Sequence, residues 1–237
     1  MTNGGWKTVW QAKGRSRTPA EIAAGDNVLR MLLELDGYES PTSSSAVDDC
    51  EVYFRHIAGM LDIRSDESVY EVGCGAGALL YWLHSQCRSL GGADFAESLV
   101  EHARAALPGV SDLRHCDASQ ISPEPRYDVV LSNGVFIYFD DEKYAREALH
   151  LMAAKAVRAI GVMDVNDAER RAEFEAMRRL RQDLYGKDYR GLGQLYFERE
   201  FFLDFARTHG LSCRIEDSRL PNSINARYRY HVAMFKR

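Results

Sequence analysis

The ten residues 69–78, VYEVGCGAGA, constrain the fold more than any other part of this chain. A short apolar run leads into three glycines at alternate positions, and a helical pattern follows. Glycines there let the chain reverse tightly and let a ligand approach the backbone more closely than a Cβ would permit. The first amides of the helix then offer hydrogen bonds and a positive dipole end to an oxygen-rich ligand. This order of strand, turn and helix therefore predicts a ligand site where the strand ends.

Short apolar runs alternate with helical segments from residue 68 onward. This alternation predicts the α/β class, with a mostly parallel sheet covered by helices on both faces. We expect strands over residues 68–72, 89–93, 112–115, 128–131 and 157–163, and a terminal pair over 211–216 and 226–235. We expect helices over residues 78–86, 96–107, 141–154, 167–184 and 198–209.

The first sixty residues have a helical pattern. Thr18 can cap a helix that begins at Pro19, and Glu21 can complete a capping box. Gly37 is placed to end that helix in a left-handed conformation. A second helix is expected over residues 47–61.

Charge and cysteine content exclude several classes of function. The chain has 30 Lys and Arg against 35 Asp and Glu, a net charge of −5, which argues against a surface for nucleic acid. Its five cysteines form no CxxC pair, so we expect no metal site and no dithiol motif. No stretch approaches the roughly 18 apolar residues that span a bilayer, and the first residues lack a secretory signal. We expect a cytoplasmic monomer or homodimer that binds a small molecule and not a membrane.

The glycine turn alone is compatible with two kinds of cofactor site. Gly73-x-Gly75-x-x-Ala78 satisfies the loose nicotinamide fingerprint, and Asp94 follows at the distance of an acid that holds a ribose hydroxyl. A short-chain dehydrogenase would also need Tyr-x-x-x-Lys to deliver a proton. None of the 12 tyrosines has a lysine four residues on, so a nicotinamide-dependent oxidoreductase is the weaker alternative.

Four ordered motifs separate the two alternatives. Glu71 precedes the glycines in E-x-G-x-G-x-G, Asp94 ends a second strand in Gly-Ala-Asp-Phe, Asp117 lies in Cys-Asp-Ala, and residues 127–133 read YDVVLSN. In this order and spacing they resemble the class I S-adenosylmethionine (SAM) methyltransferases of the small-molecule type. The resemblance covers roughly residues 65–237.

The resemblance implies a Rossmann-like, seven-stranded sheet with SAM across the carboxyl ends of the first, second and fourth strands. Asp94 would accept both ribose hydroxyls, and Asp117 would accept from the adenine amine. Phe95 would lie along the adenine or, equally, pack in the core. The implied cofactor contacts are Trp10, Glu71, Gly73, Cys74, Gly75, Asp94, Phe95, Asp117, Ala118 and Ser132.

The resemblance also divides the chain, taken as one domain, into three parts. Residues 1–64 would be a helical extension that acts as a lid, residues 65–166 the SAM-binding core, and residues 167–237 helices and a β-hairpin beside the acceptor pocket. Trp6 and Trp10 share a face if their segment is helical, and we expect them to cover the methionine end of SAM.

The segment after the fourth strand usually faces the methyl acceptor in this family. Here it reads NGVFIYF, residues 133–139, and not the N-P-P-[YF] of enzymes that methylate amino groups of nucleic acid or protein glutamine. We therefore expect a small-molecule acceptor, with Asn133 and Tyr138 as the candidate catalytic residues. Buried aromatic packing is the alternative for Tyr138.

Further candidates for acceptor binding lie elsewhere in the chain. Asp164 and Asn166 share a strand face and could hold an ammonium group, although Asp167 beside them can simply cap a helix. Arg227 and Arg229 could clamp a carboxylate or phosphate, or protect a sheet edge. Tyrosines are expected to line the pocket at positions 38, 185, 189 and 196.

The predicted activity is methyl transfer from SAM to a nitrogen or oxygen atom of a small molecule, with S-adenosylhomocysteine (SAH) as the product, in bacterial specialised-metabolite biosynthesis. The alternative is a partner subunit that binds SAM or SAH without turnover.

Overall fold

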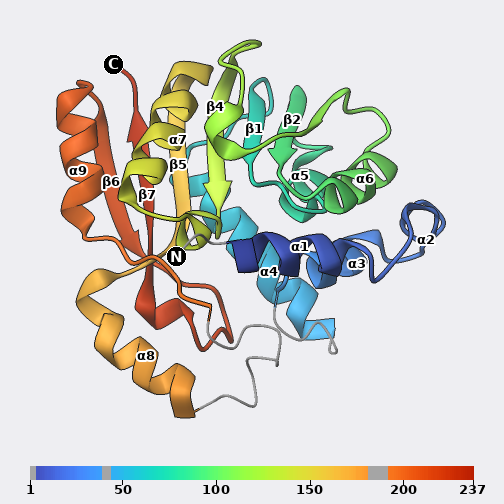
Figure 1. The fold of residues 1–237 in the computed structure, drawn as a ribbon. Coiled ribbons are helices and arrows are strands. Elements are labelled where there is room, and N and C mark those ends of the chain that lie inside the picture. The colour runs from blue at the N-terminus through green and yellow to red at the C-terminus, as the bar shows by residue number, and fades with distance from the viewer. Residues whose placement is uncertain (1–3, 39–43, 181–191) are drawn as a thin grey trace.

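A computed structural model of the chain describes residues 4–38, 44–180 and 192–237. Its centre is a seven-stranded sheet in the order β3-β2-β1-β4-β5-β7-β6, in which β7 alone runs antiparallel to its neighbours (Figure 1). The strands are β1 (Ser68–Val72), β2 (Ser89–Asp94), β3 (Asp112–His115), β4 (Tyr127–Asn133), β5 (Ala156–Asn166), β6 (Ser212–Asp217) and β7 (Arg229–Phe235). The predicted α/β, Rossmann-like architecture is confirmed.

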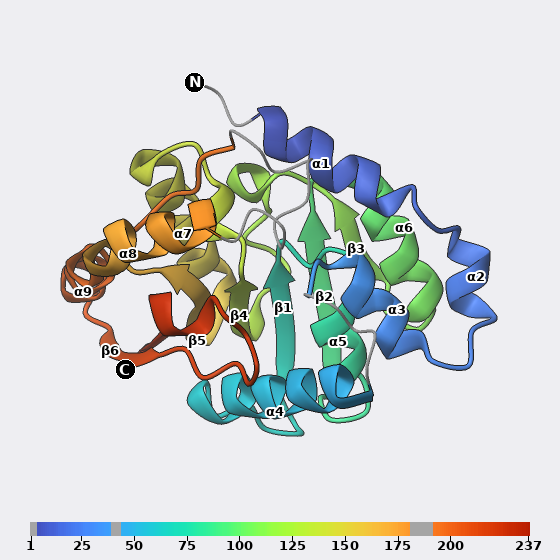
Figure 2. The ribbon, with the colours of Figure 1, turned by 90° about the horizontal axis from the view of Figure 1, so that it is seen from below.

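Helices cover both faces of the sheet, and a cluster of buried apolar residues lies between the sheet and the helices on each face. One face packs against α3 (Val28–Leu35), α4 (Ser44–Met60), α5 (Ala78–Leu83) and α6 (Glu97–Ala106). The other packs against α7 (Glu142–Lys155) and α9 (Arg199–Thr208). The remaining helices, α1 (Gly4–Gly14), α2 (Pro19–Ala23) and α8 (Arg171–Leu180), lie toward the ends of the strands (Figure 2).

The N-terminal extension differs in one respect from the prediction of a single helix between Pro19 and Gly37. Thr18 and Glu21 form the expected capping box, but α2 ends at Ala23, and α3 starts anew because Asn27 accepts from the Arg30 amide at 3.3 Å. Gly37 has the predicted left-handed conformation, with φ +79°, and ends α3.

The last strand also begins later than predicted. Residues 226–228 form a short 3-10 turn, so β7 starts at Arg229 and the expected alternation of side chains does not extend back to Arg227. Just after the neighbouring strand β5, Asp167 accepts from the Glu169 amide at 3.0 Å and caps the turn that precedes α8.

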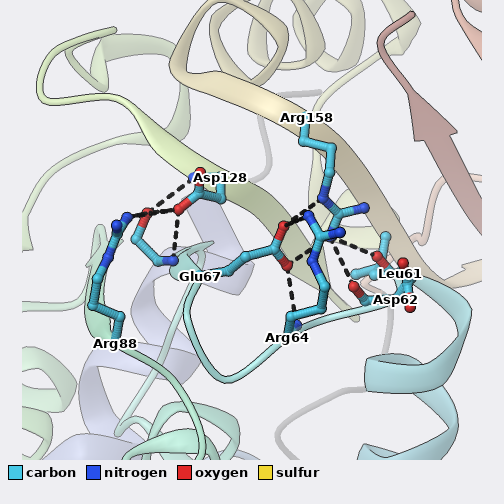
Figure 3. A network of polar contacts seen from close by, with 8 residues as sticks. Leu61, Asp62, Arg64, Glu67, Arg88, Asp128 and Arg158 are labelled. Atoms are coloured by element: carbon cyan, nitrogen blue, oxygen red, sulfur yellow. Dashed lines mark hydrogen bonds and ion pairs between the residues drawn. The ribbon is translucent and has the colours of Figure 1, made fainter.

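A polar network joins three elements at the amino ends of the strands, away from the glycine turn (Figure 3). Glu67 is 4% exposed and accepts from Arg158 Nε at 2.5 Å and from Arg64 Nη2 at 2.7 Å. Arg158 also donates to the carbonyls of Leu61 and Asp62 at 3.1 and 2.9 Å, so it fastens the end of α4 to β1 and β5. Burial opposes ionisation of Glu67, but the two guanidinium groups outweigh it and lower the pKa of this carboxyl.

Among the residues that the structure describes, no helix combines the length and apolar character that a membrane crossing requires.

Candidate active site

A cavity of about 930 Å³ opens at the carboxyl ends of β1, β2, β4 and β5. This volume is near the top of the range for small-molecule sites, roughly 300–1,000 Å³, and suits a cofactor together with a second molecule. Helix α1 lies across the same end of the strands in both views (Figures 1 and 2). The predicted site residues that line the cavity are described below from the glycine turn outward.

The glycine turn has the geometry that its sequence predicts. Gly73 and Gly75 have φ of +76° and +54°, and a Cβ at these positions would collide with Val135 and Asp36 respectively. The amides of Gly73 and Cys74 both donate to the Ala93 carbonyl, at 2.7 and 3.0 Å, which holds the turn against β2. The backbone of the turn therefore forms one wall of the cavity.

Two predicted acids lie beside this turn. Asp94 accepts from the Gly75 amide at 3.0 Å and from the Ala96 amide at 2.8 Å, and burial raises its pKa to about 6. Glu71 is 4% exposed and lines the cavity, and its Oε2 has no hydrogen-bond partner among the residues that the structure describes. Burial, with the charges of Asp36 and Asp94, raises the pKa of Glu71 well above its ordinary value.

A third acid, Asp36, joins them and was not predicted. Its carboxylate accepts from the Ala76 amide at 2.5 Å and from the Ala78 amide at 3.0 Å, so it caps the start of α5 from outside that helix. Burial raises its pKa to about 7. Asp36 follows the last residue of α3, about forty residues before the amides that it binds. No motif in the sequence links this acid to the glycine turn.

The predicted adenine side is also assembled. Phe95, Asp117 and Ala118 line the cavity together. Lys7 on α1 donates to Asp117 at 2.9 Å and lies 5.8 Å from the centre of the Phe95 ring. Burial opposes ionisation of Asp117, but hydrogen bonds from Tyr144, Lys7 and Ser119 hold the pKa of this carboxyl well below its ordinary value.

Helix α1 closes this part of the cavity with aromatic side chains. Trp6 and Trp10 both contact the ring of Tyr138, with centroids 4.6 and 5.5 Å apart, which confirms that they share a helix face. The Trp6 indole donates to the Gly193 carbonyl at 2.7 Å. The end of α1 is fastened to α6, where His102 Nε2 lies 2.6 Å from the Gly14 carbonyl oxygen.

Three cavity-lining side chains form a chain of hydrogen bonds at the carboxyl end of β4. Tyr53 donates to Asn133 Oδ1 at 2.8 Å, and Asn133 Nδ2 donates to the Tyr38 hydroxyl at 2.8 Å. Tyr38 is the acceptor in this bond, so the bond does not use its hydroxyl proton. Tyr53 was not predicted, because a tyrosine within an apolar helix pattern is indistinguishable from core packing.

An ion pair lies beside this chain of hydrogen bonds and also lines the cavity. Asp164 accepts from Arg229 Nη1, both side chains are 12% exposed, and Arg229 Nε donates to Asn166 at 3.1 Å. Asp164 has φ +59°, where the pairing of β5 with β7 shifts register, and its amide donates to His231 Nδ1 at 3.0 Å. A non-glycine residue held in this conformation is strained, which is most common at functional sites.

Four predicted residues do not reach the cavity. Arg227 is exposed on the 3-10 turn, and its guanidinium lies 4.5 Å from the centre of the Tyr228 ring. Tyr196 packs against Phe174 in a separate cluster. Ser132 and Asn166 are buried behind the wall, and Asn166 holds Arg229 without touching the space itself.

The remaining tyrosine candidates, at positions 185 and 189, lie outside the described residues. Arg178 and Gln194 line the cavity although no motif marked them, and Arg178 donates to Gln194 at 3.2 Å. The positions of Arg178 and Gln194 depend on how α8 and the segment before Tyr196 pack against the rest of the protein. Local sequence patterns do not predict this packing.

Comparison with known proteins agrees with this geometry. Residues 69–159 match the family described as "Methyltransferase domain". An uncharacterised methyltransferase of Schizosaccharomyces pombe is 34% identical over 85 residues, which are 33% of this chain and 31% of that protein. The chain therefore matches only about a third of that curated relative.

Solved methyltransferase structures share the whole fold at low sequence identity. The magnesium protoporphyrin IX methyltransferase of Synechocystis, with bound SAH, has a TM-score of 0.60 at 13% identity over 88% of this chain and 92% of that one. The N-methyltransferase NodS of Bradyrhizobium japonicum, in complex with SAH, has 0.57 at 17% identity over 94% and 97%. SAM-bound CalS10 of Micromonospora echinaspora, an amino pentose methyltransferase of calicheamicin biosynthesis, has 0.58 at 15% identity over 80% and 90%.

Proposed function

We propose that this chain, whose residues 69–159 match a methyltransferase domain, is a class I SAM-dependent methyltransferase that transfers the methyl group of SAM to a nitrogen or oxygen atom of a small molecule. The observation that carries the proposal is the convergence on one cavity of the glycine turn, Asp94 and Asp117, each at the end of its own strand. A glycine turn that only packed helix against strand would not require these acids beside it.

The residues at the turn suit the parts of this cofactor. Asp94, already fixed by two backbone amides, would take the ribose hydroxyls, and the turn at Gly73 would hold the methionine end. Phe95 and Ala118 would flank the adenine. Bound SAM supplies an activated methyl on a sulfonium, so the protein has chiefly to align the acceptor and exclude water.

The lid would exclude that water. Trp6 and Trp10 on α1 cover the cavity next to Tyr138, and Lys7 ties the same helix to Asp117. Residues 1–64 therefore act as an extension that closes over a bound cofactor. Because α1 lies across the strand ends, we infer that it must move for SAM to enter.

The side chains around Asn133 would select the acceptor. The hydroxyls of Tyr38 and Tyr138 can hydrogen-bond an acceptor atom, and the Asp164–Arg229 pair offers a carboxylate to an amine and a guanidinium to an anionic group. Asn133 would act by orienting Tyr38. The net charge of −5 favours a small molecule over nucleic acid.

The proposal places the protein in specialised metabolism, in the cytoplasm, as a monomer or homodimer. The fold shared with CalS10 supports the metabolic role. The five free cysteines support the cytoplasm, because free thiols are typical of a reducing compartment. A partner subunit that binds SAM or SAH without turnover is the second candidate, since every cofactor contact named above would serve binding alone.

Calorimetry with SAM and SAH, followed by an assay of SAH release with a panel of small amines and phenols, tests the proposal. Binding together with release supports a methyltransferase. Binding with no release across the panel favours the partner subunit, and failure to bind either molecule rejects the assignment.

A further inference from the structure

Strand β5 contains one extra residue where it pairs with β7. The flanking pairs in register are Val162 with Val232 and Val165 with Tyr230. Between them β5 has two residues, Met163 and Asp164, and β7 has only His231. Two residues opposite one form a β-bulge, a feature that often lies next to an active site and redirects a side chain there.

The bulge turns Asp164 out of the apolar layer under α7 and α9. Regular alternation along β5 would put Asp164 on the same face as Val162, which packs in that layer. Instead Val165 packs in that layer, and Asp164 lines the cavity. Glycine is the usual residue at a left-handed position of a bulge, and Asp164 has φ +59° there. The carboxylate is therefore held toward the cavity at a cost in backbone strain.

The side chain of His231 satisfies the backbone amide of this bulge. The Asp164 amide donates to His231 Nδ1 at 3.0 Å, whereas amides within a sheet normally donate to a backbone carbonyl. Burial lowers the pKa of His231 to about 4, so the ring is neutral near pH 7. Because Nδ1 accepts, the single ring proton is on Nε2.

A histidine is a poor choice for this position if it only fills space. His231 is 0% exposed, and its protonated Nε2 has no hydrogen-bond partner among the residues that the structure describes. A buried donor without a partner costs free energy that an apolar side chain would avoid. The bond between Nδ1 and the Asp164 amide is the gain that offsets this cost.

We propose that His231 is a positioning residue for the methyl acceptor: it holds the bulge so that the Asp164 carboxylate faces the cavity beside Arg229 and binds an amino group of the acceptor. This inference rests on the proposed function, in which Asp164 contacts the acceptor. Asp164 Oδ2 accepts from Arg229 Nη1 and lies 4.0 Å from the point where Gly134 would carry a Cβ. The carboxylate is therefore next to the segment that follows β4. An ionised carboxylate only accepts hydrogen bonds and attracts positive charge, so it suits an amine better than a phenol.

The test measures the acceptor KM by SAH release, with the amine of the panel that wild type methylates, and the Kd of SAM by calorimetry. His231→Leu has no acceptor at the Nδ1 position and should raise the acceptor KM about tenfold without changing the Kd of SAM. His231→Asn places Oδ1 two bonds from Cβ, as Nδ1 is, and should keep the acceptor KM within threefold of wild type. Because His231 acts through Asp164, adding His231→Leu to Asp164→Asn should raise the KM less than twofold further.

Met234→Ala is the matched control. Met234 lies on the same strand, is equally buried at 0% exposure, and packs under α7 and α9. Its truncation should lower stability in urea and leave the acceptor KM unchanged. His231→Val replaces His231→Leu if the leucine variant does not fold. Nitrogen-15 NMR of the imidazoles, with His231→Asn to identify the signal, should show an unprotonated Nδ1 in wild type.

Three results would overturn the inference and leave the proposed function intact. They are an unchanged acceptor KM in the folded apolar variant, an additive effect in the Asp164→Asn background, and a protonated Nδ1 in wild type. SAH release with phenols alone would overturn the assignment of an amino group to Asp164. Absence of SAH release from wild type with the whole panel of amines and phenols would instead reject the proposed function.

Discussion

Replacing Asp36 with Asn should change how the stability of the unliganded protein depends on pH. The substitution removes one of three neighbouring carboxylates and keeps the size of the side chain and one acceptor oxygen. In the folded protein burial, followed by the charge of Asp94, raises the Asp36 pKa from 3.8 to about 7, although two backbone amides and Lys13 favour the ionised form.

The sign follows from proton linkage. Between pH 4 and 7 the folded protein holds a proton on Asp36 that the unfolded chain has already released, so the free energy of unfolding falls as pH rises. About two pKa units separate pH 5 from the folded-state pKa, and each unit corresponds to about 1.4 kcal/mol. The wild type should therefore lose up to roughly 2 to 3 kcal/mol between pH 5 and 8 through this group. Asp36 is only partly buried, so screening by solvent makes this an upper limit.

The Asn variant lacks this titration but loses the hydrogen bond from one amide, at about 1 to 2 kcal/mol at any pH. It should be less stable than wild type at pH 5 and equally or more stable at pH 8. Urea unfolding followed by circular dichroism at pH 5, 6, 7 and 8, with linear extrapolation, measures both curves. Parallel curves would refute the argument. Glu34→Gln, which changes an acid of α3 that is paired with Arg17, should run parallel to wild type.

Three further changes test separate parts of the site and fold. Asp94→Ala removes two charge-assisted contacts and should weaken SAM binding about a hundredfold in calorimetry; a change of less than threefold would mean that the ribose lies elsewhere. Deletion of residues 1–17 removes α1 and should weaken SAM binding about tenfold and reduce turnover, whereas unchanged values would rule out the lid. Glu67→Gln should lower the free energy of unfolding at pH 7 by about 3 kcal/mol, because it leaves Arg158 without its carboxylate, and should not change SAM affinity. Since the Glu67 pKa is lowered by folding, its contribution should disappear as pH falls below about 4, and a loss of equal size at pH 3 and pH 7 would contradict it.

Much of the cavity around the glycine turn could be predicted because its signals are local. The strand that ends at Val72, the turn at Gly73 and Gly75, and the acid at Asp94 all lie within 30 residues, and each is dictated by backbone geometry at its own position. The capping box at Thr18 and the left-handed Gly37 were predicted for the same reason.

The acceptor side was harder, because its residues depend on long-range packing. Arg227 and Arg229 look equivalent in the sequence, yet a short 3-10 turn exposes the first and leaves the second paired with Asp164. The direction of Asp164 in turn follows from a register shift and a left-handed backbone, neither of which its neighbours in sequence reveal.

The sequence by itself determined that a parallel sheet carries a glycine turn with acids at the ends of successive strands, since these features follow from strand periodicity, glycine conformations and motif spacing. Only the tertiary structure decided that Asp36 joins Glu71 and Asp94, and that Tyr138 is the ring against which Trp6 and Trp10 pack. The physical reason is that both arrangements are made by contacts between elements distant in sequence. Their free energy depends on burial and distance, which no local pattern records.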